Sequence, residues 1–78
     1  MLSTPRTHEL REFYLCGIRT GYRNSKHAEQ AAANWDNHTT YDCEYCPSVH
    51  HVKADALHSE DKLTAYATDH WNSFITKL

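Results

Sequence analysis

The stretch YDCEYCPSVHHV, residues 41–52, carries two cysteines, two adjacent histidines and a proline within twelve positions. Cys43 and Cys46 form a Cys-x2-Cys pair, a spacing that lets one tight turn place both sulfurs on a single metal ion. Pro47 fixes the exit of that turn, and the chain then returns as a strand that carries His50. The motif therefore predicts three metal ligands close together in the sequence.

The fourth ligand must come from elsewhere, because Zn²⁺ in structural sites takes four tetrahedral ligands, mostly thiolate sulfur and imidazole nitrogen. Cys16 is the only other cysteine. A Cys3His site of Cys16, Cys43, Cys46 and His50 would leave no cysteine unused. His51 is the alternative histidine. Successive side chains of a strand point to opposite faces, so only one of the two reaches the ion, and we favour His50.

The chain needs such a staple because its apolar inventory is small. Among 78 residues, Leu, Ile, Val and Phe number twelve, and eight further residues are alanine. Nine aromatic residues compensate in part, since each can bury roughly 150–250 Å². A net charge of −2 argues against wholesale disorder. A small ordered domain with so thin a core usually relies on disulfides or a metal.

The cysteine count favours the metal. Three is an odd number, which suits a disulfide framework badly. No N-terminal stretch resembles a signal peptide, and no apolar run approaches the roughly 20 residues that span a bilayer. We therefore expect a cytoplasmic protein with reduced thiols, no membrane contact and bound Zn²⁺.

The patterns around the motif predict an α+β fold. Residues 3–16 indicate a brief helix with Thr4 as N-cap and Pro5 at its first position. Residues 16–24 hold both glycines and predict a strand whose edge carries Cys16. That strand would pair with a strand at residues 38–43, and residues 48–53 would form the returning strand.

Two longer helices are predicted. Residues 25–37 form an alanine-rich helix, with Ser25 as its cap, Trp35 covering its end and Asn37 at its exit. Residues 58–78 form an amphipathic C-terminal helix capped by Ser59. We thus expect one domain over residues 1–78, with a ββα-like zinc-binding core at 16–52 and a short two- or three-stranded antiparallel sheet.

The segment from Cys16 to residue 52 resembles a group of short zinc-finger-like proteins of actinobacteria and their bacteriophages. Their pattern is a cysteine, a basic-aromatic strand, an alanine-rich helix and then Tyr-x-Cys-x2-Cys-x3-His. The resemblance implies Cys16, Cys43, Cys46 and His50 as zinc ligands and a phage-like setting in a host cytoplasm. It names no activity, because such proteins are generally of unassigned function. Two residues depart from the pattern, Val49 in place of an aromatic residue and Pro47 in place of a small or polar one.

Three classes of function compete. The first is a non-catalytic binding module that engages a host or partner protein, or a second copy of itself, through the apolar stripe of the C-terminal helix. We place Tyr66, Trp71 and Phe74 in that contact, although such stripes commonly serve as core. The second is a nucleic-acid-binding finger, in which basic and aromatic residues of segment 19–27 would meet phosphates: Arg19, Tyr22, Arg23 and Lys26.

The third class, an enzyme, has little support. The motif echoes His-Asn-His nucleases but lacks their second Cys-x2-Cys and a convincing downstream Asn–His pair. Four protein ligands also leave no open position on a catalytic zinc.

A pI near 6.3 argues against the nucleic-acid class. The sequence therefore favours a zinc-stabilised protein-binding module and no enzymatic activity.

Overall fold

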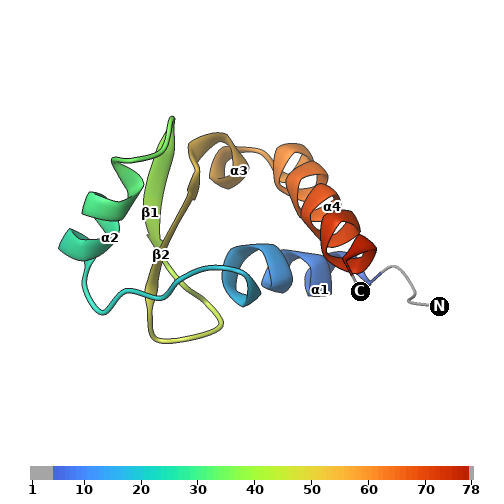
Figure 1. Cartoon of the computed structure of the whole chain (residues 1–78), viewed down its shortest axis with the longest axis horizontal. Helices are drawn as coiled ribbons and strands as arrows, with labels where there is room; N and C mark the ends of the chain where they lie inside the picture. The colour runs from blue at the N-terminus through green and yellow to red at the C-terminus, as the bar shows by residue number, and fades with distance from the viewer. Residues whose placement is uncertain (1–4, 78) are drawn as a thin grey trace.

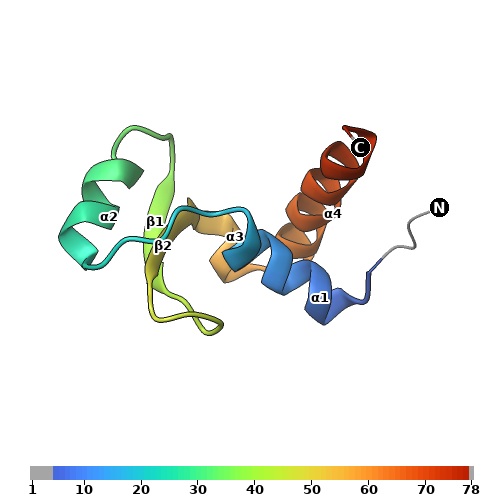
Figure 2. The same ribbon diagram turned by 60° about the horizontal axis from the view of Figure 1, so that its bottom comes forward.

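A two-stranded antiparallel sheet occupies the middle of the structure, a computed structural model in which residues 5–77 are described (Figure 1). Strand β1 (His38–Asp42) pairs with β2 (Val49–Lys53), and Tyr41 lies opposite His50. Helix α2 (Ser25–Ala32) lies on one side of this hairpin, and the other helices lie on the opposite side (Figures 1 and 2). The predicted α+β class and the two-stranded form of the sheet are confirmed.

The N-terminal helix differs from the prediction in its start and in its last turn. Helix α1 (Thr7–Glu12) begins after Arg6, whose backbone N–H donates to Glu9 Oε1 at 3.0 Å. The predicted start at Pro5 is therefore wrong, and Thr4 lies outside the described residues. The chain continues directly into η1 (Phe13–Gly17), a widened π-helical turn.

Because η1 extends through Cys16, this cysteine lies on a helix and not on the strand edge that the sequence predicted. Tyr14 and Leu15 are buried in the same turn, and their burial keeps the chain helical here. The predicted strand at 16–24 is reduced to an isolated bridge between Tyr22 and Val49. It therefore meets β2, and not β1 as expected.

Helix α2 packs its alanines against the sheet. Ala28 and Ala32 are buried, and these small side chains allow close approach of the two backbones. The helix is capped by Asn24, whose side chain accepts a hydrogen bond from His27 N at 2.9 Å. The prediction that Ser25 caps this helix is therefore wrong, and Ser25 is its first helical residue. Asn37 adopts a left-handed conformation (φ 56°) where the chain turns into β1.

The main core lies between the hairpin and the helices on the side away from α2. It joins residues of α1, η1, β2, α3 (Ala54–His58) and α4 (Glu60–Thr76). Its buried members are Leu10, Tyr14, Leu15, Val52, Ala56, Leu63 and Ala67. The sequence did not predict α3, which has only five residues and so shows no periodicity.

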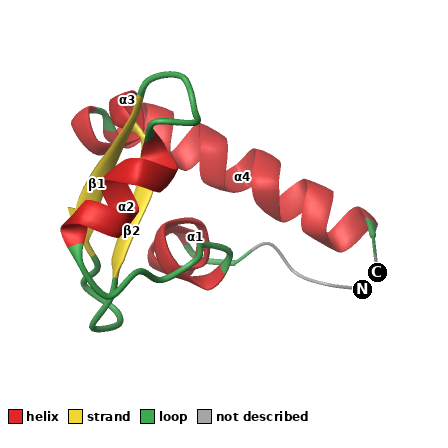
Figure 3. Cartoon of the chain, turned by 60° about the vertical axis from the view of Figure 1, so that its left-hand side comes forward, coloured by secondary structure: helices red, strands yellow, loops and turns green. Residues whose placement is uncertain are grey.

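The C-terminal helix α4 matches its prediction closely. Ser59 caps it by accepting a hydrogen bond from Lys62 N at 3.3 Å, and Leu63 and Ala67 face the core. The helix extends away from the hairpin, which gives the molecule extents of 40 × 22 × 22 Å (Figure 3). Of the helices within residues 5–77, none combines the length and apolarity needed to cross a membrane.

Candidate metal centre

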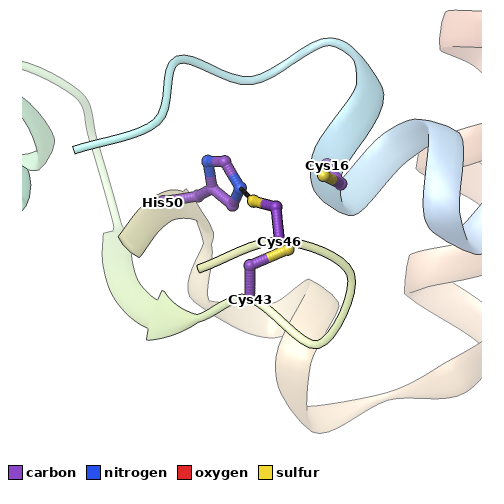
Figure 4. A group of neighbouring side chains, drawn as sticks. All are labelled: Cys16, Cys43, Cys46 and His50. Carbon is purple, nitrogen blue, oxygen red and sulfur yellow. Dashed lines mark hydrogen bonds between the residues drawn. The ribbon is translucent and has the colours of Figure 1, made fainter. Parts of the chain in front are cut away.

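Four potential ligands converge where η1, the β1–β2 loop and β2 meet (Figure 4). They are Cys16 from η1, Cys43 and Cys46 from the loop and His50 from β2. Their ligand atoms all lie within 4.8 Å of one another, and all three cysteines are free thiols. The structure thus brings together the four residues that the sequence selected as metal ligands.

The β1–β2 loop holds its two sulfurs with backbone hydrogen bonds. Cys43 N donates to Ser48 O at 3.1 Å and closes the loop, while Tyr45 N donates to Cys43 Sγ at 3.3 Å. The pKa of the Cys46 thiol is lowered to about 6, chiefly by a backbone hydrogen bond from Ser48 and also by hydrogen bonds with His50 and the other two cysteines. Backbone N–H groups directed at sulfur favour the thiolate, which is the form that binds metal.

His50 is oriented as a ligand by the chain that passes over it. Its side chain is buried, and its Nδ1 lies 2.8 Å from Thr20 O. A carbonyl only accepts, so Nδ1 carries the proton and Nε2 keeps a free lone pair. Nε2 lies 3.4 Å from Cys46 Sγ. This arrangement, in which the second ring nitrogen donates to a carbonyl, is typical of metal-bound histidines.

His51 points away from the cluster, to the sheet face that α2 covers. Its Nδ1 lies 2.9 Å from Nδ1 of His38, and the Trp35 ring stacks on His38 with a centroid separation of 5.3 Å. The alternation expected for a strand therefore separates the two histidines, and His50 is the one beside the thiols.

The linker between η1 and α2 is held against the loop at Gly21. Tyr22 and Val49 exchange two backbone hydrogen bonds of 2.9 Å. A Cβ on Gly21 would lie 2.7 Å from Ser48 Oγ and 2.9 Å from Ser48 Cβ. Only glycine allows this approach, which keeps the Thr20 carbonyl over His50.

The donor set fits a metal ion. Three thiols and a neutral imidazole are the usual ligands of structural zinc, and a tetrahedron with Zn–S bonds of about 2.3 Å has edges of about 3.8 Å. The separations in the cluster exceed this by at most 1.0 Å, because their upper limit is 4.8 Å. Burial and the neighbouring thiols raise the pKa of Cys16 to about 12. A divalent cation would remove this mutual repulsion, so the cluster can bind a metal ion.

The four residues predicted to bind nucleic acid do not form one exposed basic surface. Arg19 donates from Nε to Tyr14 O at 2.9 Å and from Nη1 to His51 O at 3.4 Å. Its guanidinium also lies 4.4 Å from the centroid of the Tyr14 ring. Tyr22 is half-buried at its bridge to β2, and only Arg23 and Lys26 are exposed.

The three residues predicted to bind a partner differ in how far they are exposed. Tyr66 and Trp71 pack against the core, and Tyr66 donates its hydroxyl hydrogen to Asp55 Oδ2 at 2.8 Å. Trp71 contacts the Phe13 ring edge-on at a centroid separation of 5.3 Å. Phe74, on the same helix, is 45% exposed. Phe74 is therefore the member of the three that a partner can reach most easily.

Sequence reasoning missed the groups that orient the ligands. The Thr20 carbonyl and the amides of the loop are backbone atoms, which carry no residue signal. Gly21 had a weaker signal, because a lone glycine fits many environments. Comparisons with protein-family models, curated proteins and solved structures find no match to this chain.

Proposed function

We propose that this protein is a zinc-stabilised, non-catalytic binding module that engages a partner protein through its helical surface. The observation that carries the proposal is the Cys3His cluster, whose ligand atoms lie within 4.8 Å of one another. Thiolate and imidazole together favour zinc over the hard cations, which prefer oxygen ligands.

The ion would act as a staple. Cys16 belongs to the helical side of the molecule, while the other three ligands belong to the hairpin. One ion would therefore link the two sides of the molecule next to a main core that has seven buried side chains among the described residues. Structural zinc sites contribute directly to folding free energy, and many small domains of this kind unfold without metal.

The absence of catalysis follows from the ligand count. A catalytic zinc keeps one position open for water or substrate, whereas a Cys3His set fills the tetrahedron. A role in binding then explains why large apolar side chains remain at the surface, Phe74 among them. The phage-like setting rests on the resemblance of residues 16–52 alone.

The proposed structural zinc is tested by elemental analysis of the purified protein, of variants that lack one ligand, and of a variant of the neighbouring histidine. We expect one zinc per chain, lost together with the fold in Cys43→Ser, Cys46→Ser and His50→Ala. His51→Ala is the matched control, since His51 lies on the opposite face of the same strand and should retain zinc. A metal-free protein that unfolds in a sharp transition would refute the staple.

The class of partner is tested by affinity capture from a plausible host lysate, with and without nuclease. A protein that remains bound after nuclease treatment supports the binding module. Loss of all captured material on nuclease treatment would instead favour nucleic acid as the partner.

A further inference from the structure

A groove of about 460 Å³ opens between η1 and α4 on one side and the end of α2 on the other. Its walls include Ile18, Trp35 and Phe74, which are 41%, 60% and 45% exposed. These are three of the five large hydrophobic side chains that are exposed among residues 5–77. Exposed apolar surface is therefore concentrated at one hollow, and such concentration marks interaction sites.

Among the described residues that line the groove, the two permanently charged side chains are both positive. Arg19 and Lys77 line it, and no lining residue within the described part of the chain is acidic. The whole chain carries a net charge of −2, so a positive groove is a local reversal. Arg19 is also fixed in place, because its Nε and Nη1 donate to the carbonyls of Tyr14 and His51.

From this complementarity we propose that the groove binds a short acidic peptide segment of a partner protein. A bulky apolar side chain of the peptide enters between Trp35 and Phe74, and neighbouring carboxylates meet Arg19 and Lys77. This inference rests on the proposed function, because it specifies where and how the binding module holds its partner. Electrostatic complementarity sets the specificity, and the buried apolar side chain supplies most of the affinity.

A peptide fits the groove better than a nucleic acid does. A nucleic-acid strand presents a negative phosphate at every nucleotide and needs a track of cations. Within residues 5–77 only two permanent cations line the groove, and the exposed Arg23 and Lys26 are not among its lining residues. Two cations beside exposed apolar walls suit one or two carboxylates that flank an apolar side chain.

The proposal is tested by selecting a random 12-residue peptide library against the zinc-loaded protein. We expect enriched peptides to pair Asp or Glu with a bulky apolar residue. Lys77→Glu and Phe74→Ala should each weaken the selected peptides by about tenfold or more. The matched controls are Lys62→Glu, a charge reversal near the other end of α4, and Leu57→Ala, an exposed apolar residue outside the groove.

Trp35→Ala gives an independent test from the opposite wall. Zinc content and unfolding midpoint are measured for every variant, so that a loss of fold is not mistaken for a loss of binding. The proposal fails if no peptide is enriched, if the enriched peptides are basic, if the controls weaken binding equally, or if a 12-mer of deoxythymidine competes with them. If a captured partner survives nuclease and still binds Lys77→Glu, the groove is wrong while the proposed function stands.

Discussion

Replacing Gly21 by alanine should disturb both the fold and the metal centre. The new Cβ would lie 2.9 Å from Ser48 Cβ and 2.7 Å from Ser48 Oγ. Carbon atoms in contact prefer about 3.5–4.0 Å, so the two backbones must separate by about 0.6 Å or more. They cannot do so freely, because Tyr22 and Val49 exchange two hydrogen bonds directly beside this contact.

The expected cost follows from two opposing effects. Overpacking of this kind destabilises by about 1–3 kcal/mol, while the loss of glycine freedom in the unfolded chain returns about 0.4–1 kcal/mol. We therefore expect Gly21→Ala to lower the free energy of unfolding by about 1.3 kcal/mol, the difference between the midpoints of the two ranges. The shift also moves the Thr20 carbonyl away from His50 Nδ1, so zinc affinity should fall by about 10- to 100-fold.

Gly17→Ala is the matched control. A Cβ there would meet only Phe13 Cδ1, at 3.9 Å, which is an ordinary contact. Gly17 lies in the helical turn η1, so alanine should stabilise it by about 0.5–1 kcal/mol. The assays are denaturant unfolding followed by circular dichroism, and zinc affinity by competition with a chelator.

Ser48→Gly should rescue Gly21→Ala in the double variant, because it removes both atoms that would lie within 3.0 Å of the new Cβ and leaves only an ordinary contact with His50 Cε1 at 3.7 Å. Ser48→Ala should rescue it only in part, since the shorter side chain still leaves the Cβ contact. Equal unfolding midpoints for Gly21→Ala and Gly17→Ala would refute the reasoning. So would an unchanged zinc affinity in Gly21→Ala.

Three further predictions concern capping, packing and alkaline pH. Asn24→Ala should cost about 1 kcal/mol in denaturant unfolding, because it removes the cap of α2, and equal losses in Ser25→Ala would contradict this. Leu63→Ala should cost about 2–5 kcal/mol, since Leu63 is buried; the exposed Leu57→Ala should cost far less, and comparable losses would contradict the assigned core. Burial raises the pKa of Tyr41 above its ordinary value of 10.0. Its contribution to stability is therefore full below about pH 10 and is lost as the pH rises further. In an alkaline titration, the phenolate absorbance of Tyr41 should appear only when the protein unfolds. It is identified as the part of the tyrosine absorbance that Tyr41→Phe lacks. If that part appears at about pH 10 while the protein is still folded, Tyr41 is not buried.

The convergence of the four candidate metal ligands could be predicted because their signal is local and chemical. The Cys43 and Cys46 pair fixes a turn, His50 follows at a spacing that a returning strand can use, and Cys16 is the only other thiol. Strand alternation also separated His50 from His51 correctly. The α4 helix was predictable for a similar reason, because its cap and its apolar stripe are both present in the sequence.

The element that carries Cys16 could not be predicted from its neighbours. Glycines with β-branched and aromatic residues are typical of a short strand, yet the burial of Tyr14 and Leu15 extends the helix through this residue. Tertiary packing overrode local propensity here. Trp35 was predicted to cover the end of a helix over residues 25–37. Instead α2 ends at Ala32, and the large ring is exposed at the rim of the groove.

The spacing of the four ligands has a consequence for the order in which the protein assembles. Cys43, Cys46 and His50 belong to one hairpin, so an ion can be captured there while the rest of the chain is still disordered. Cys16 lies far away in sequence and would reach such an ion only after a long loop has closed, which is slower and entropically more costly. We therefore expect metal loading to begin before folding is complete, with the arrival of the first cysteine as the step that commits the chain to its native topology.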